Sequence, residues 1–276
     1  MKAYYCPLFE LPLPPGHTFP MVKYRRLFEA VRAQAPAWGI DLHEPAPATD
    51  ADLLRVHCPE YIGRMRRGDA TGEELRRIGF PWSEAMVRRS CLSSGATIAA
   101  LRAAIAGEGV AANLAGGTHH AAFDRGGGYC VFNDAVIAAR HVQAHGLARR
   151  LLVVDLDAHH GNGTAALCAH DPSVFTFSMH AAKTYPALKP ASDLDVPLAA
   201  GTGDAEYLDL LAAHLPLAIE RAEADAAIYL AGADPYAGDR LGGLGLSAAG
   251  LAERDRAVFA ACARAGLPVA VAMAGG

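Results

Sequence analysis

The sequence lacks any C-x-x-C pair, and its six cysteines stand singly along the chain. They are Cys6, Cys58, Cys91, Cys130, Cys168 and Cys262. This scatter argues against a disulfide framework or a cysteine zinc site, and it is typical of the reducing cytoplasm. No apolar run is long enough to cross a bilayer, and the residues from Met1 to Tyr5 contain no signal-peptide core. We therefore predict a cytoplasmic protein without a membrane partner.

An excess of positive charge is also missing. The chain has 25 lysines and arginines against 29 aspartates and glutamates, which gives a formal net charge of -4 at pH 7. This balance offers no basic field for nucleic acid, so we predict no nucleic-acid partner. Two catalytic signatures are absent as well: the G-x-S-x-G nucleophile elbow and the G-x-G-x-x-G dinucleotide fingerprint.

Apolar residues are plentiful and make up 52% of the 276 residues, which is enough for the core of one large domain. Strand-like and helix-like patterns alternate, which predicts a single α/β domain over residues 1–276 with three α/β/α layers and a mainly parallel sheet. Residues 181–203 are expected to form a loop, and Pro216 to kink or interrupt its helix. We expect strands at Val110–Ala115, Leu151–Val154, Ser173–Met179, Ala226–Ala231 and Leu267–Met273, and the main helices at Lys23–Gln34, Ser83–Ala106, Asn133–His145, Asp204–Glu220 and Ala248–Ala265.

The stretch from Leu151 to Gly163 carries the first candidate site. It begins as an unbroken apolar run, typical of a buried parallel strand, and ends in polar residues bounded by glycine. Because side chains alternate along an extended backbone, Asp155, Asp157 and His159 would share one face. Two carboxylates and an imidazole aimed at one point are costly without a cation or a proton network. The simpler alternative is a solvated turn with two capping aspartates.

Two further predicted strands end in residues of the same kind. The tandem pair His119-His120 follows one of them, and Asp234 follows the other. Parallel strands of one sheet bring their carboxyl ends to the same edge, so these tips should meet. Asp157, His159 and Asp234 then make a mixed oxygen and nitrogen set with an open coordination position, as a catalytic zinc site requires. The two histidines would act as general base and acid.

Four phrases of the sequence together resemble the histone deacetylase superfamily. They are Gly-Gly-Thr-His-His at 116–120, Asp-Arg-Gly-Gly-Gly-Tyr at 124–129, Asp-Leu-Asp-Ala-His-His-Gly-Asn-Gly at 155–163, and Ala-Gly-Ala-Asp at 231–234 with the later Gly-Asp-Arg-Leu-Gly-Gly-Leu. They look most like the class IV branch and its bacterial relatives. The resemblance covers most of the chain and implies the arginase/deacetylase fold. It also implies a zinc-dependent amidohydrolase that removes an acetyl or longer acyl group from acyl-lysine or a small acylated amine.

The resemblance further implies a role for each matching residue. His119 and His120 match the histidine pair that handles protons, and Asp155 matches the carboxylate behind the first. Asn162 stands where other branches carry an aspartate behind the second, so His120 should be less basic than in an aspartate-backed site. The residues that match the ligands of one Zn²⁺ are Asp157, His159 and Asp234.

Two more sites follow from the resemblance. Gly128 and Tyr129 match the wall of a substrate tunnel, with Tyr185 opposite. A second metal, as in arginases, is not expected, because Gly161 and Tyr236 stand where further carboxylates would be needed. A buried monovalent cation, K⁺, would be held by matching residues Asp155, Asp157, His159, Ser178 and Met179, with backbone carbonyls doing much of the coordinating.

One departure from the family pattern concerns the end of the chain. The family places a transition-state tyrosine directly after the glycine pair that is here Gly275-Gly276, where this sequence ends. Losing one hydrogen-bond donor to an oxyanion costs about 10²–10³ in rate. We therefore expect a domain truncated at its C-terminus, with an intact metal site and impaired turnover. The alternative is a non-catalytic homologue that only binds the metal or the acylated amine.

The remaining histidines are expected to lie outside the site. His160 falls on the opposite face from His159 and is predicted to be structural. For His180, a supporting place behind the metal ligands and a purely structural place both stay open. Ordinary surface or core positions are predicted for His57, His141, His145, His170 and His214.

Overall fold

The computed structural model describes residues 1–276, and its centre is one sheet of eight strands. All seven strand pairings are parallel, and the strand order is β2-β1-β3-β8-β7-β4-β5-β6. Every strand therefore ends at the same edge of the sheet. The strands are β1 (Lys2–Tyr4), β2 (Asp41–His43), β3 (Val110–Asn113), β4 (Leu151–Asp155), β5 (Val174–Ala181), β6 (Leu194–Leu198), β7 (Ala226–Leu230) and β8 (Val269–Ala272).

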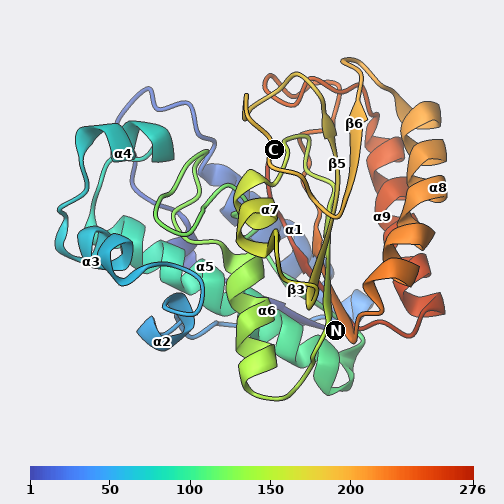
Figure 1. Ribbon diagram of the computed structural model, residues 1–276, viewed down its shortest axis with the longest axis horizontal. Helices are drawn as coiled ribbons and strands as arrows, with labels where there is room; N and C mark the ends of the chain where they lie inside the picture. Colours follow the sequence, from blue (N-terminus) through green and yellow to red (C-terminus); the bar gives the residue numbers. More distant parts are fainter.

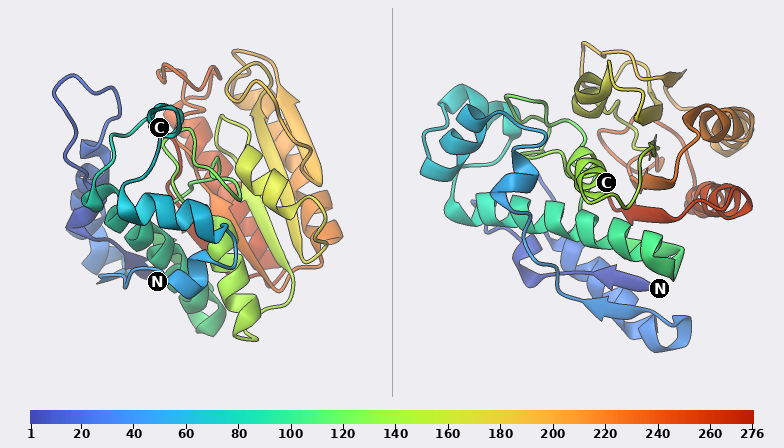
Figure 2. Two further views of the ribbon diagram at one scale, coloured as in Figure 1. Left: turned by 60° about the vertical axis from the view of Figure 1, so that its left-hand side comes forward. Right: turned by 60° about the horizontal axis from the view of Figure 1, so that its bottom comes forward.

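Helices cover both faces of this sheet, with α5 and α6 on one face and α8 and α9 on the other (Figure 1). Figure 2 shows α1 near the end of the sheet that is formed by β1 and β2. The helices are η1 (Pro7–Phe9), α1 (Val22–Trp38), α2 (Asp50–Leu53), α3 (Pro59–Arg67), α4 (Gly72–Ile78), α5 (Glu84–Ala103), η2 (Ala104–Glu108), α6 (Asp134–Ala144), α7 (Asn162–Cys168), α8 (Asp204–Ala222) and α9 (Ala248–Arg264). The predicted three-layer α/β/α architecture is confirmed. None of these helices combines the length and the apolar character that a bilayer crossing needs.

Strand β4 shows how the apolar run is divided between the two faces. All five of its residues are buried. Leu151 and Val153 join the core beneath α5 and α6, whereas Leu152 and Val154 join the core beneath α8 and α9. This alternation is the period of an extended strand, and it places the strand centrally, with apolar layers on both sides. The polar residues that follow β4 therefore emerge at the sheet edge between the two helical layers.

The expectation of a loop over residues 181–203 is wrong in part, because β6 lies within it. Strand β6 pairs with β5 alone and forms one edge of the sheet. An edge strand needs backbone partners on one side only, so it tolerates Pro197. The proline and the neighbouring aspartates hid the strand pattern in the sequence.

Of the two effects expected at Pro216, a kink or an interruption, the interruption does not occur, since α8 continues to Ala222. A proline within a helix leaves the carbonyl four residues earlier without its usual partner. Here that carbonyl belongs to Ala212, and both Ala212 and Pro216 lie on the exposed side of α8. Water can solvate the freed carbonyl, which removes most of the cost.

His57 is a core residue that joins two segments beside the sheet edge. Its side chain is buried, with Nδ1 donating to the carbonyl oxygen of Ala122 at 2.8 Å and Nε2 accepting from the backbone N–H of Asn133 at 3.0 Å. Burial lowers the pKa of His57 to about 4 from the usual 6.5, despite the opposing effect of the Ala122 carbonyl. The imidazole is therefore neutral at pH 7, as this bridge requires.

We predict that this bridge makes the fold sensitive to acid. The unfolded chain protonates His57 near pH 6.5 and the folded chain only near pH 4, so stability present above pH 6.5 is lost as the pH falls toward 4. Between pH 7 and pH 4.5 the free energy of unfolding should fall by about 2 kcal/mol more in the wild type than in His57→Gln. Urea unfolding at both pH values measures this difference. Equal losses in the two proteins would contradict the assignment.

Candidate active site

Three predicted ligand residues meet where β4 and β7 end. Nδ1 of His159 lies 3.1 Å from Oδ1 of Asp157 and 2.9 Å from Oδ2 of Asp234. Both carboxylates are almost fully buried, and the imidazole is 16% exposed. The parallel pairing of β4 with β7, in which Asp155 is opposite Leu230, brings the two loops together.

Backbone N–H groups satisfy the remaining carboxylate oxygens. Oδ2 of Asp157 accepts from Gly275 at 2.7 Å, and Oδ1 of Asp234 accepts from Ala158 at 2.9 Å. Each aspartate is thereby held by a segment other than its own, Asp157 by the end of the chain after β8 and Asp234 by the loop after β4. The ligand geometry consequently depends on three neighbouring strands.

The electrostatics of this triad are those of a cation site. Burial, and then the charge of Asp157, raise the pKa of Asp234 to about 7. Burial by itself would lower the pKa of His159, but hydrogen bonds to both aspartates and their charges raise it to about 10. Two adjacent buried carboxylates thus require positive charge between them. A proton on His159 provides it in the free protein, and a divalent metal ion provides it better.

The donor set fits zinc. One ligand atom from each of the three residues lies within 4.8 Å of the others. Tetrahedral zinc, with bonds of about 2.0–2.2 Å, places neighbouring ligand atoms roughly 3.3–3.6 Å apart. The separations of 2.9 and 3.1 Å need to widen by only roughly half an ångström. Two oxygens and one nitrogen leave a fourth position open, as in catalytic zinc sites.

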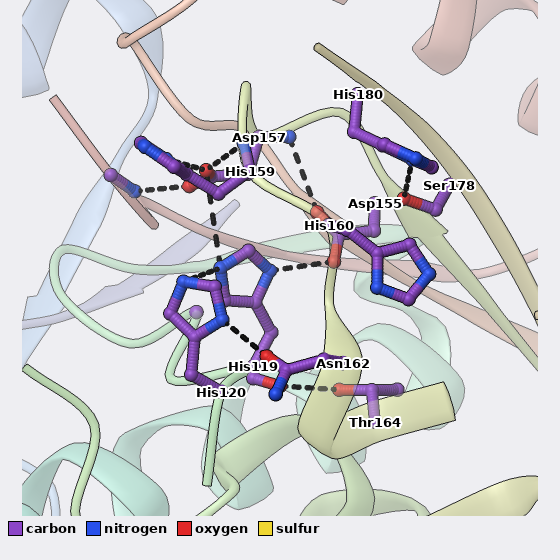
Figure 3. A network of polar contacts seen from close by, with 12 residues as sticks. His119, His120, Asp155, Asp157, His159, His160, Asn162, Thr164, Ser178 and His180 are labelled. Carbon is purple, nitrogen blue, oxygen red and sulfur yellow. Dashed lines mark hydrogen bonds and ion pairs between the residues drawn. The ribbon is translucent and has the colours of Figure 1, made fainter. Parts of the chain in front are cut away.

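The tandem histidines lie beside this triad as a linked pair (Figure 3). Nδ1 of His119 lies 2.7 Å from Oδ2 of Asp155, and Nδ1 of His120 lies 2.6 Å from Oδ1 of Asn162. The two Nε2 atoms are 3.2 Å apart. The order of contacts is therefore Asp155, His119, His120, Asn162, and the Nε2 edges of both rings meet in its middle.

The two partners give the two histidines opposite pKa shifts. For His119, burial acts downward, but the charges of Asp155 and Asp157 raise the pKa to about 9. For His120, burial and the positive charge of His119 lower the pKa well below 6.5, and the hydrogen bond to Asn162 does not offset them. At neutral pH His119 is charged and His120 is neutral, with a proton on Nδ1 donated to Asn162 and a lone pair on Nε2.

Two glycines let these side chains approach so closely. A Cβ on Gly161 would lie 2.3 Å from Oδ2 of Asp155, on the contact that this oxygen makes with His119. A Cβ on Gly128 would lie 2.3 Å from the ring of His120, and the backbone there has a φ of +52° that favours glycine. Larger residues at either position would displace the histidine pair.

Arg254, which sequence reasoning missed, connects the segments that follow β4 and β7. It is 2% exposed, and its Nη1 atom donates to the carbonyl oxygens of Gly232 at 2.6 Å and Leu156 at 3.3 Å. Leu156 directly precedes the ligand Asp157, and Gly232 stands two residues before the ligand Asp234. The sequence did contain a signal that Arg254 is buried. Arg254 follows Leu251 by three residues, which at helical spacing places it on the same, buried side of α9.

Asp134 plays the same part for the histidine pair and was also missed. Asp134 is fully buried at the start of α6. Its carboxylate accepts hydrogen bonds from the backbone N–H groups of Gly117 at 3.0 Å and Thr118 at 2.6 Å. The hydroxyls of Thr118 and Thr97 donate to it as well. These bonds fix the loop directly before His119. An aspartate in the first turn of a helix suggested only a favourable helix end.

Two of the three proposed tunnel residues, Tyr185 and Gly128, lie against the histidine pair. The ring of Tyr185 packs edge-on against His120 with centroids 4.8 Å apart, and Gly128 lies against the other part of that imidazole. Tyr129 packs instead against Phe19 and Phe80, with centroids 4.7 and 5.2 Å away. Tyr185 is 46% exposed, so its ring contacts both solvent and the buried His120.

The monovalent-cation site stays a prediction, because backbone carbonyls would do much of the coordinating. Asp155 and Ser178 are opposite each other in the β4–β5 pairing and both line a cavity of about 10 Å³. That volume is close to the size of one water molecule. The side chains of Asp157 and His159 belong to the triad and that of Met179 lies in the apolar core, so these residues would contribute backbone carbonyls.

The other histidines lie away from the triad. His160 and His180 contact each other on the far side of the β4 tip (Figure 3). His141 pairs with Asp52 in the helical layer, and the ring of His214 contacts its own helix. None of these side chains contacts the linked pair.

Comparison with known proteins places this geometry in a family. The model of the histone deacetylase domain matches residues 17–276, and the chain belongs to the histone deacetylase family. An uncharacterized protein of Picosynechococcus sp. is 42% identical over 272 residues, which cover 99% of this chain and 90% of that protein. The class IV branch is not distinguished by these comparisons and stays a prediction.

Two named relatives are more distant. Histone deacetylase 2 of Arabidopsis thaliana is 31% identical over 84% of this chain, and a histone deacetylase-like amidohydrolase of Pseudomonas aeruginosa is 32% identical over 83%. The matches span 62% and 64% of the lengths of these two proteins. The crystal structure of the HDA15 HD domain has a TM-score of 0.81 at 22% identity, covering 100% of this chain and 86% of the other, which shows the shared fold.

We predict that Arg254→Met lowers metal affinity without removing a ligand. The substitution leaves the carbonyls of Leu156 and Gly232 without their donor, so the two ligand-bearing loops lose their relative position. Loss of such a supporting contact typically costs about 10–100-fold in metal affinity. Competition with a chromophoric zinc chelator measures the dissociation constant. Arg264→Met, at an exposed position of the same helix, is the matched control, and equal affinities in the two variants would count against this role.

Proposed function

We propose that the chain is a zinc-dependent amidohydrolase that removes an acetyl or longer acyl group from acyl-lysine or a small acylated amine. Membership of the histone deacetylase family supports a hydrolase of the deacetylase type. The observation that carries the finer proposal is the meeting of the Asp157–His159–Asp234 triad with the His119–His120 pair at one edge of the sheet. The six isolated, buried cysteines support a cytoplasmic location.

The metal would be held by Asp157, His159 and Asp234. A zinc ion in such a site acidifies water and polarises a carbonyl oxygen. His120 is the general base, since its neutral ring offers an Nε2 lone pair while Nδ1–H is held by Asn162. As the water oxygen bonds to the acyl carbon, the released proton goes to Nε2 of His120.

His119 has the complementary part. Asp155 keeps it protonated at neutral pH, so its positive charge faces the developing negative charge of the attacked amide. When the C–N bond breaks, the leaving amine takes up a proton from the pair and departs along Tyr185. In this proposal the alkyl chain of the substrate lies against the ring of Tyr185, which packs on His120.

A potassium ion at a structural site is part of the proposal. Asp155 and Ser178 would face it from the small cavity that they line, with backbone carbonyls completing the coordination.

The first test is hydrolysis of fluorogenic acyl-lysine peptides and acetylated small amines of graded acyl length. Zinc-loaded protein should release the amine, a chelator should stop the release, and added zinc should restore it. His120→Ala should lower kcat by about 10²–10⁴ with zinc content unchanged, because it removes the base and not a ligand. His170→Ala, at an exposed turn, is the control that should retain wild-type activity.

Bound zinc without hydrolysis of any acylated amine would overturn the enzymatic proposal. That result would favour a homologue that binds metal or acylated amine without turnover. Elemental analysis of the same samples separates it from simple failure to load zinc.

We further predict that Asn162→Asp moves the acid limb of the kcat/KM profile to higher pH. A carboxylate at Nδ1 of His120 would stabilise the charged ring and raise its pKa, so the base would be protonated and inactive up to a higher pH. Initial rates between pH 5 and 9 measure the shift. Asn162→Ala removes the hydrogen bond without adding charge and should produce no upward shift; an identical shift in both variants would contradict the explanation.

A further inference from the structure

A second cluster of metal-binding side chains lies outside the proposed catalytic site, toward the β6 edge of the sheet. It consists of His160 in the loop after β4, His180 in β5 and Asp195 in β6. One potential ligand atom from each residue lies within 4.8 Å of the others. Figure 3 shows His160 directed toward His180 and Ser178, away from the His119–His120 pair.

Strand register explains why these residues meet. In the β5–β6 pairing Asp195 is opposite Ser178, and Ser178 is in turn opposite Asp155 of β4. His180 is two residues beyond Ser178, so its side chain leaves the same face of the sheet as Asp195 does. The chain turns after β4 and brings His160 over that face. Three segments thus supply one residue each.

The distances suit direct coordination of one ion. Nε2 of His160 lies 3.3 Å from Oδ1 of Asp195, which equals the spacing of neighbouring ligands about a metal with bonds of about 2.0 Å. The rings of His160 and His180 are 4.6 Å apart at their centroids and nearly perpendicular, with an interplanar angle of 78°. His160 and His180 are buried, whereas the side chain of Asp195 is 28% exposed and opens the cluster to solvent.

Hydrogen bonds within the protein leave this cluster incompletely satisfied. Oδ2 of Asp195 accepts from the backbone N–H of Ser192 at 2.8 Å, but Oδ1 is buried and has no hydrogen-bond partner. His160 is fully buried, and its Nδ1 atom also has no partner. Its Nε2 atom has two long contacts of 3.3 Å, one with the hydroxyl of Ser192 and one with Oδ1 of Asp195. Buried polar atoms without partners are rare, and an ion bound in this cluster would supply a partner.

We propose that His160, His180 and Asp195 form a second metal site, which binds a divalent first-row transition metal ion. Two imidazole nitrogens and one carboxylate oxygen are ligands that zinc, iron, cobalt and nickel share, whereas calcium and magnesium prefer oxygen alone. The ion bonds to Oδ1 of Asp195, the buried oxygen that accepts no hydrogen bond within the protein. Water reaching the site past Asp195 completes the coordination.

The surroundings of His180 match a ligand histidine. Its Nδ1 atom lies 3.0 Å from the hydroxyl oxygen of Ser178, which can accept a hydrogen bond from Nδ1–H. Histidines that bind metals usually donate their second ring N–H in this way, which fixes the tautomer and leaves Nε2 free for the ion. Ser178 therefore positions His180 for binding.

The site would tie three elements at one end of the sheet. Strand β6 is otherwise held by β5 alone, and the loop that carries His160 also carries the catalytic-site ligand His159. An ion between His160, His180 and Asp195 fastens β6 to the tip of β4. Its effect is structural, because neither His160 nor His180 contacts the His119–His120 pair.

The test counts Co²⁺ ions bound to the full chain after removal of all metal and equilibrium dialysis. Elemental analysis should find two ions per chain in the wild type and one each in Asp195→Asn, His180→Gln and Asp234→Asn. The double variant Asp195→Asn/Asp234→Asn should bind none. Asp193→Asn, a nearby exposed position whose carboxylate only accepts hydrogen bonds, is the matched control and should keep two.

A second readout guards against misfolding of a variant. In Asp234→Asn only the second site remains, so Co²⁺ in about hundredfold excess over its dissociation constant should raise the melting temperature by about 5 °C or more. The same addition should leave the double variant unchanged. One ion per chain in the wild type, or two in Asp195→Asn with native circular dichroism, would overturn the second site and leave the catalytic proposal intact.

Discussion

The two carboxylates Asp157 and Asp234 lie side by side in the buried edge of the sheet, and much of the surrounding structure follows from that constraint. Burial and mutual repulsion both oppose a negative charge on the two carboxylates at once, so a nearby positive charge is needed. His159 lies between them, Gly275 and Ala158 donate backbone N–H groups, and Arg254 holds the two loops from beneath. These contacts form only if the strands end in register, so the geometry of the site depends on the pairing of the parallel sheet.

The same constraint sets the properties of the neighbouring histidines. His119 and His120 are identical in type and adjacent in sequence, yet one is charged and the other neutral at pH 7. Asp155 and the triad supply negative charge to the first, whereas the second has only the amide of Asn162 and the repulsion of its charged neighbour. A base and a cation thus arise from two copies of one side chain because their partners differ.

Much of the fold and of the candidate site could be predicted from the sequence. The apolar run ending at Asp155 is long, unbroken and followed by polar residues, so strand β4 and its tip stood out clearly. Strand β6 did not, because Pro197 and the aspartates around it mask an edge strand. Helix α4 was also missed, although Thr71 and Glu74 form the capping box that announces its start. The expected truncation of the domain and the tunnel role of Tyr129 stay predictions.

By itself, the sequence determined which chemical groups are present and which strand ends carry them, since local apolar runs, glycines and motif spacing are properties of short segments. Only the tertiary structure decided which of those groups meet. In the sequence Arg254 is one of many arginines, and only the fold brings its side chain to the carbonyls of Leu156 and Gly232. Asp134 likewise looks like an ordinary helix-end residue, and only the fold brings the backbone N–H of Thr118 to its carboxylate. His160, His180 and Asp195 likewise come together only through the register of β5 and β6. Contacts between distant segments depend on the packing of the whole sheet, which no short stretch of sequence contains.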